Sequence, residues 1–264
     1  MPELADTTIT IPVRFDSTGR VRNLKVVLRF LLAHLGAPIL LCEEGPRSLA
    51  GEFLPEFLDR IGYIFTHSDA PHFHKTRCLN RLARAARTPY LLSHDTDVLA
   101  TPRQYAQAHG VLAQGADMTF PYDGQCLEVA DEGITRIWAE GSLAHLGPAN
   151  CRIRAARVFG GCVFLRREAF FAAGMENEHF RAWGLEDDER VARFANLGLR
   201  VERVAGPLFH LEHPRPADQV GPGNPCYQAN DREYRKVIGM GADELKAYIA
   251  TWPWLAEPQP QETP

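Results

Sequence analysis

Two carboxylates stand one residue apart in the sequence, at Asp95 and Asp97, directly after an apolar run at residues 90–93. The run has the composition of a short β-strand, so both side chains are expected at a strand end. Such a pair can hold a hard divalent cation such as Mg²⁺ or Mn²⁺, which can bridge two phosphates of a nucleotide and neutralise a leaving group. The alternative is that the acids only form a turn and cap the helix expected to begin near Pro102.

Two histidines three residues apart, His210 and His213, follow a second β-like run. Histidine is the side chain that most often binds metals. Two imidazoles and one carboxylate from elsewhere in the chain would form a mixed nitrogen and oxygen site, which suits Mn²⁺ better than Ca²⁺. The alternative is that both are exposed loop histidines near Pro214.

Four consecutive acids at residues 186–189 come shortly after Trp183 and Gly184. The face of a tryptophan can stack on a sugar ring, and a carboxylate beside it can take a hydroxyl proton as a general base. Acids in the first turn of a helix also interact favourably with the helix dipole, so the cluster could serve only to begin a helix. That reading explains the acids but gives Trp183 and Gly184 no role.

Short β-like runs alternate with helical patterns over the first 120 residues, which predicts an α/β fold with helices that cross over between strands of one sheet. Strands are expected at residues 8–13, 38–42, 63–66, 90–93 and 117–120, and helices at residues 21–35, 49–60, 75–86 and 102–114. Ligands of such sheets gather at the carboxyl ends of the strands. Asp95 and Asp97 lie at one of these ends.

The second half of the sequence has weaker periodicity. Residues 122–150 are expected to form long loops with one short ribbon, and long loops tend to be functional. A strand that contains Gly160 and Gly161 is expected at residues 154–165, and further elements at residues 166–173, 186–197, 199–204 and 208–211. The proline-rich segment at residues 252–264 is expected to be a disordered tail that follows a single domain at residues 1–251.

Composition excludes several classes of protein. A formal net charge of −4 over 264 residues provides no basic field for binding nucleic acid. No apolar run approaches the roughly 20 residues that cross a bilayer, and the first residues carry acids where a signal peptide carries basic residues. None of the six cysteines forms a Cys-x-x-Cys pair, so disulfides and a cysteine metal site are not expected, and we expect a reducing, cytoplasmic location.

Read in order, these motifs resemble the GT-A glycosyltransferases, in particular the β-1,4-galactosyltransferase family and bacterial modules of the chondroitin-polymerase type. The resemblance runs from Thr8 to about Arg215 and is strongest at Phe159-Gly160-Gly161, at the Trp-Gly-x-Glu-Asp-Asp core of residues 183–188, and at the two histidines. It implies a Rossmann-like mixed sheet flanked by helices. The nucleotide-binding half would span about residues 7–120, and the half that binds the acceptor and closes the metal site about residues 151–251.

The resemblance also implies site residues. A UDP-sugar donor would contact residues at several strand ends and loops: Pro12, Val13, Arg14, Phe73, Lys75, Asp95 and Gly161. Asp97, as the second acid of the Asp-x-Asp motif, would bind Mn²⁺ or Mg²⁺ with His210 and His213. Asp95 would be a ribose contact or lie behind the metal.

The acid cluster receives its roles from the same resemblance. Asp187 would be the general base, while Glu186 and Asp188 would hold the acceptor sugar or the reactive geometry. Trp183 and Gly184 would bind the acceptor. One departure from the family is Leu185, because animal members carry a second glycine at this position, and leucine makes a stiffer link after Gly184.

The resulting prediction is an inverting, metal-dependent glycosyltransferase that moves a hexose (Gal, GalNAc, GlcNAc or Glc) from a UDP-sugar to an acceptor hydroxyl. One alternative is a sugar-nucleotide-binding or glycan-binding module that keeps the fold without turnover. The other is a metal-dependent hydrolase that uses Asp95, Asp97, His210 and His213, which would leave Trp183 without a role.

Overall fold

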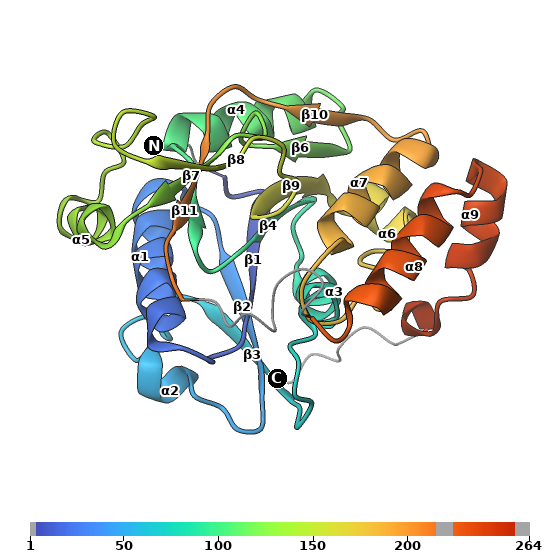
Figure 1. Cartoon of the computed structure of the whole chain (residues 1–264), viewed down its shortest axis with the longest axis horizontal. Coiled ribbons are helices and arrows are strands. Elements are labelled where there is room, and N and C mark those ends of the chain that lie inside the picture. The colour runs from blue at the N-terminus through green and yellow to red at the C-terminus, as the bar shows by residue number, and fades with distance from the viewer. Residues whose placement is uncertain (1–3, 215–223, 257–264) are drawn as a thin grey trace.

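A computed structural model describes residues 4–214 and 224–256 of the chain, and it contains two β-sheets flanked by helices (Figure 1). The larger sheet has seven strands in the order β10-β6-β9-β4-β1-β2-β3, and the smaller has four in the order β5-β11-β7-β8. The strands are β1 (Thr7–Val13), β2 (Ile39–Gly45), β3 (Gly62–His67), β4 (Tyr90–His94), β5 (Val98–Leu99), β6 (Met118–Phe120), β7 (Cys126–Val129), β8 (Arg152–Ala155), β9 (Cys162–Arg166), β10 (Val201–Arg203) and β11 (Leu208–Leu211).

The α-helices that the structure describes cover these sheets and extend to one side of them (Figure 1). They are α1 (Thr18–His34), α2 (Ala50–Phe53), α3 (Lys75–Ala85), α4 (Pro102–Ala113), α5 (Asp131–Glu140), α6 (Arg167–Ala172), α7 (Glu186–Asn196), α8 (Tyr227–Ile238) and α9 (Ala242–Ile249).

Strand β1 lies inside the large sheet between β4 and β2, and its seven residues are all buried because neighbouring strands and helices enclose it. It pairs in parallel with β2 and with β4, and β3 continues the parallel part. Strand β9 runs antiparallel to both β4 and β6, so the sheet is mixed. The parallel strands end at one edge, and this brings the residues that follow β1 and β4 to the same side of the molecule.

The small sheet joins two segments that are far apart in the sequence. Strand β5 begins directly after Asp97, and β11 carries His210, which pairs with Val98 of β5. The backbone N–H of Leu211 also donates to the Asp97 carbonyl at 2.8 Å. The predicted acid and histidine motifs therefore meet through strand pairing.

Three expectations about individual elements were wrong. The helix expected at residues 49–60 is only the one-turn α2, because Pro55 disfavours a helical conformation at Leu54. The strand expected at residues 154–165 divides into β8 and β9, which belong to different sheets and are separated by the left-handed Gly161 (φ +103°). Residues 122–150 contain helix α5, whose buried Ile134 and Ile137 lie one turn apart.

The disordered tail predicted at residues 252–264 starts too early, because its first residues are ordered and partly buried. Residues Pro253–Ala256 form a 3-10 helix, and both Trp252 and Trp254 are buried. Arg84 donates to the carbonyl of Trp254, and the guanidinium of Arg193 lies 5.3 Å from the Trp252 ring centre. Burial of two indoles outweighs the proline-rich composition here. The remainder of the predicted tail, residues 257–264, lies outside the described residues.

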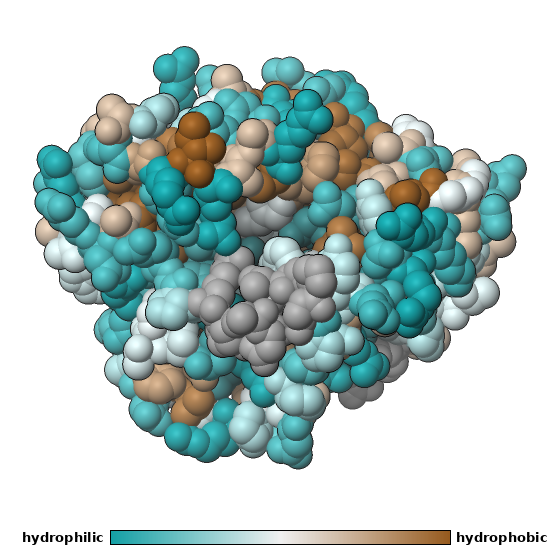
Figure 2. Space-filling model, viewed as in Figure 1, coloured by the Kyte–Doolittle hydropathy of each residue, from teal (hydrophilic) through white to brown (hydrophobic). Residues whose placement is uncertain are grey.

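The face of the molecule seen in Figure 1 has a mostly hydrophilic surface, with separate hydrophobic patches above its centre (Figure 2). Within residues 4–214 and 224–256, none of the helices combines the length and apolar character that a membrane span requires.

Candidate active site

A cavity of about 600 Å³ opens at the carboxyl ends of β1 and β4, and residues from both halves of the chain line it. Most residues expected from the sequence to form the site lie on its wall: Pro12, Arg14, Phe73, Lys75, Asp95, Asp97, Gly161, Trp183, Gly184, Glu186, Asp187, Asp188 and His210. Two others lie behind the wall. Val13 is buried in β1, and His213 lies against Asp97 with a fully buried side chain.

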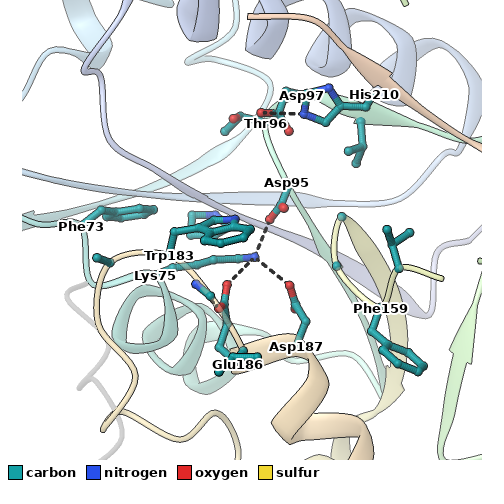
Figure 3. Close-up of a pocket in the computed structure, with 18 of the residues that line it drawn as sticks. Phe73, Lys75, Asp95, Thr96, Asp97, Phe159, Trp183, Glu186, Asp187 and His210 are labelled. Carbon is teal, nitrogen blue, oxygen red and sulfur yellow. Dashed lines mark hydrogen bonds and ion pairs between the residues drawn. The ribbon is translucent and has the colours of Figure 1, made fainter. Parts of the chain in front are cut away.

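One corner of the cavity holds three potential metal ligands. A ligand atom from each of Asp97, His210 and His213 lies within 4.8 Å of the other two. Asp97 Oδ2 is 2.8 Å from His213 Nε2 and 3.8 Å from His210 Nε2. Figure 3 shows Asp97 and His210 facing each other above Asp95.

The tautomer of His213 bears on whether this corner suits a cation. Nδ1 of His213 lies 3.0 Å from the Pro214 carbonyl, which can only accept, so the neutral tautomer that donates to this carbonyl presents its lone pair at Nε2. That buried Nε2 makes no hydrogen bond to any residue within the described ranges, although it faces the Asp97 carboxylate. Two electron-pair donors that converge in this way fit a divalent cation.

A second corner is built around Lys75, the first residue of α3. Its Nζ lies 3.0 Å from Asp95 Oδ1, 3.6 Å from Glu186 Oε1 and 3.6 Å from Asp187 Oδ2 (Figure 3). Burial opposes the charge of this ammonium group, but the three carboxylates raise its pKa well above the ordinary value. Lys75 therefore stays protonated.

Asp187 is held by a second cation from its own helix. Arg190 Nη2 donates to Asp187 Oδ1 at 2.6 Å, and Nη1 of the same buried guanidinium donates to Glu176 Oε1 at 2.5 Å. Burial raises the pKa of the Asp187 carboxyl, but the charges of Lys75 and Arg190 more than offset this and hold the pKa below its usual value. Asp187 is therefore ionised at neutral pH.

The two acids beside Asp187 have the opposite shift. Burial, followed by the negative charge of Asp187, raises the pKa of Glu186 to about 7. The same two causes raise the pKa of Asp188 above its usual value. Neighbouring carboxylates with pKa values pushed apart are a common arrangement where proton transfer takes place.

Two glycines allow the backbone before β9 to pack closely against these acids. A Cβ atom at Gly160 would lie 2.5 Å from Asp187 Oδ2, so no side chain fits at this position. A Cβ atom at Gly161 would lie 2.6 Å from Leu208 Cδ2, and the carbonyl of Gly161 accepts from the backbone N–H of Asp95 at 2.7 Å. The Gly-Gly pair thus lets the loop pass close to both acids.

Trp183 lies on the cavity wall opposite the loop of Phe159, with 45 % of its surface exposed (Figure 3). Its backbone is followed by Gly184, whose N–H donates to Glu186 Oε2 at 3.0 Å. An exposed indole face beside carboxylates can pack on a sugar ring while the acids bind its hydroxyl groups.

The sequence interpretation missed Arg190, Glu176, Arg154, Arg157 and Tyr227. The last three line the cavity, and the first two fix Asp187 from behind. Arg190 had a detectable signal, because residues three apart on a helix face the same side and can form an ion pair. Glu176 had none, since its contact with Arg190 depends on the tertiary fold.

Comparison with known families points to a class of enzyme. Residues 142–214 match a family model described as the N-terminal domain of galactosyltransferase. This segment is galactosyltransferase-like. It contains β9, the start of α7 and both histidines, so the resemblance drawn from the motifs is confirmed. No curated protein sequence matched the chain.

Solved structures extend the comparison to the fold. The galactosyltransferase-like chain matches GalNAc-T7 in complex with UDP, GalNAc and Mn²⁺ (TM-score 0.54, 14 % identity, 92 % of this chain and 50 % of that one) and TarS of S. aureus (TM-score 0.54, 10 % identity, 92 % and 42 %). A structure of Drosophila β1,4-galactosyltransferase 7 with manganese, UDP-Gal and xylobiose matches with a TM-score of 0.46 and 17 % identity, over 75 % of this chain and 63 % of that one. The chain thus spans less than two thirds of each of these three chains, and its mixed sheet flanked by helices is the GT-A fold.

Proposed function

We propose that this galactosyltransferase-like protein is an inverting, metal-dependent hexosyltransferase that moves Gal, GalNAc, GlcNAc or Glc from a UDP-sugar to an acceptor hydroxyl. The observation that carries the proposal is that one cavity joins a three-ligand corner at Asp97 to an ionised carboxylate at Asp187. These are the two groups that an inverting sugar transfer needs, one beside the leaving group and one beside the nucleophile.

Asp97, His210 and His213 would hold Mn²⁺, or Mg²⁺ as a poorer substitute, since one carboxylate and two imidazoles form a mixed oxygen and nitrogen set. When bound, the cation supplies positive charge that stabilises the UDP leaving group. GalNAc-T7, a protein with the same fold, binds UDP and Mn²⁺ together in its solved structure.

The donor would lie along the ends of β1 and β4. Pro12 and Arg14 border the cavity, whereas Val13 has a buried side chain and would contact the nucleotide through its backbone. Phe73 would pack beside the base, and Lys75 would turn its charge toward the phosphates. Fixed positive charge at a leaving group is often the largest catalytic contribution of an active site.

Asp187 would remove the proton from the acceptor hydroxyl. Arg190 occupies its Oδ1, which leaves Oδ2, beside Lys75 and packed close to Gly160, to accept the proton. Attack from the face opposite the UDP group is a single displacement, so the anomeric configuration inverts. Trp183 would support the acceptor ring, with Gly184, Glu186 and Asp188 around its hydroxyl groups.

The test is a screen of UDP-Gal, UDP-GalNAc, UDP-GlcNAc and UDP-Glc for UDP release, each with Mn²⁺, with Mg²⁺ and with a chelator, followed by product analysis. We expect one sugar to be preferred, Mn²⁺ to support the fastest release, and the chelator to stop it. A glycosylated product with inverted configuration supports transfer. Release of free sugar alone, with every acceptor offered, would favour the hydrolase, and metal-dependent UDP binding without release would favour the non-catalytic module.

A further inference from the structure

The loop that carries Trp183 has an unusual backbone conformation. Ala182 (φ 57°), Gly184 (φ 116°) and Leu185 (φ 71°) all lie in the left-handed region, and two of these residues are not glycine. A residue with a side chain is strained in the left-handed region and persists there where surrounding contacts determine its conformation. The loop must therefore be held from outside.

Asn230 on α8 provides the principal contact. Its Oδ1 accepts from the N–H of Arg181 at 3.2 Å, and its Nδ2 donates to the carbonyls of Arg181 at 3.0 Å and Gly184 at 3.1 Å. One amide thus bridges the residues on both sides of the turn that presents Trp183. Asn230 is only 1 % exposed, so water does not compete for these bonds.

Three further contacts hold other backbone groups of the loop. Asn224 Nδ2 donates to the Trp183 carbonyl at 2.5 Å, the N–H of Ala182 donates to the Phe73 carbonyl at 3.1 Å, and the N–H of Gly184 donates to Glu186. These partners come from the segment before α3, from α7 and from the residues that lead into α8. The conformation is therefore fixed by separate parts of the chain.

Helix α8 is suited to act as the support. It packs along α7, and its buried residues Asn230 and Val237 lie seven apart, on the side that faces the protein (Figure 1). Its outer side is hydrophilic (Figure 2). Asn230 is the polar member of this inner face, at the level of the Trp183 loop.

We propose that Asn230 is a positioning residue that holds Trp183 in its cavity-facing position before any nucleotide binds. The platform for the acceptor is then preformed and does not depend on donor binding. The meaning of this platform for sugar transfer rests on the proposed function, whereas the position of the loop does not. In the transferase, an acceptor could bind to the enzyme without UDP-sugar.

Hydrogen exchange at the backbone amides of Ala182 and Gly184 tests the proposal without turnover. In the unliganded full-length protein, both amides should exchange at least about tenfold more slowly than in an unstructured peptide, because each is hydrogen-bonded. Addition of UDP and Mn²⁺ should change the two rates by less than about twofold. Asn230→Ala should accelerate exchange at Ala182 and Gly184 by about tenfold or more, since it removes three hydrogen bonds.

Asn196→Ala is the matched control. Asn196 is a half-buried asparagine at the end of α7, and its Nδ2 donates to the Met240 carbonyl, away from the Trp183 loop. This variant should leave both amides within about twofold of wild type.

The proposal is overturned if the loop amides exchange freely in the unliganded protein, if protection arises only with UDP and Mn²⁺, or if Asn230→Ala leaves the rates unchanged. Should Asn230→Ala also remove protection from α8 itself, Asn224→Ala decides, because Asn224 donates to the Trp183 carbonyl. Faster exchange at Gly184 with α8 intact supports a loop held by side chains of this region, and unchanged exchange overturns the proposal. A protein that never releases UDP would refute the proposed function and leave this measurement as it stands.

Discussion

The two acidic corners of the cavity use the same kind of side chain in different surroundings. At the metal corner, Asp97 faces two imidazoles, which can be neutral donors. At the Lys75 corner, Asp95, Glu186 and Asp187 surround an ammonium group, and Arg190 adds a second cation behind Asp187. One corner is arranged to receive a cation, and the other already contains its own.

This difference supports the division of chemistry that we propose. Carboxylates balanced by fixed cations have shifted pKa values and suit proton transfer. A carboxylate beside neutral nitrogen donors suits a metal ion, because the bound cation itself supplies the positive charge that completes the site. Substitutions in the two corners should therefore have separable effects, on turnover in one and on nucleotide affinity in the other.

Asp187→Asn should have the largest effect. The amide keeps the shape of the side chain but cannot accept the acceptor proton, and a general base contributes about 10²–10⁴-fold to rate. We expect turnover to fall by at least about a hundredfold, with UDP affinity in Mn²⁺ unchanged. Initial rates and calorimetry with UDP measure the two quantities.

Asp188→Asn is the matched control, because Asp188 is the next acid in the same first turn of α7. It removes the same charge from the helix start but leaves the ion pairs of Asp187 with Lys75 and Arg190 intact, so it should lower the melting temperature less than Asp187→Asn does. Measured well below both melting temperatures, its turnover should fall far less, through weaker acceptor binding and not through loss of proton transfer. Equal loss of turnover in both variants, in step with melting temperature, would mean that the acids serve only to begin the helix.

Asp97→Ala should have a smaller effect on a different quantity. Loss of a metal ligand should weaken UDP binding in Mn²⁺ by at least about tenfold, and His213→Ala should do the same. Asp69→Ala is the matched control, because Asp69 and His67 form an exposed acid–imidazole pair with 3.6 Å between Oδ2 and Nε2. Calorimetry that gave equal UDP affinity with and without a chelator in the wild-type protein would contradict the metal assignment.

The sequence predicted those parts of the site that local pattern determines. Apolar runs gave the central strands within a few residues of their bounds, and the acids and His210 border one cavity, with His213 behind its wall. Strand ends and helix starts are encoded by neighbouring residues, so motifs at these points keep their positions when the chain folds.

The unpredicted parts depend on contacts between distant segments. Asn230 lies on a helix with no functional motif, and its role follows only from its bonds to Arg181 and Gly184. Glu176 binds Arg190 across the fold, and the carbonyl of the buried Trp254 accepts from Arg84, 170 positions away. Composition indicated a disordered tail for this last segment because it cannot report what a tryptophan packs against.

Glu186→Gln should have the smallest effect, on the pH dependence of stability. The folded protein raises the pKa of Glu186 to about 7 from an ordinary value of 4.5, so this side chain is protonated in the fold and ionised in the unfolded chain between those pH values. The unfolded state binds fewer protons there, and stability therefore falls as pH rises from about 4.5 to 7. Glutamine resembles the protonated acid and has no such loss. The melting temperature of Glu186→Gln relative to wild type should rise between pH 5 and pH 8, by no more than several degrees, since Lys75 partly compensates the ionised form.

The control is Glu244→Gln, because Glu244 is an exposed acid in the first turn of α9, and this variant should show no such change. If the two variants behaved alike, burial between Asp187 and Lys75 would not control the Glu186 proton, and the Lys75 corner would be no more specialised for proton transfer than any helix start.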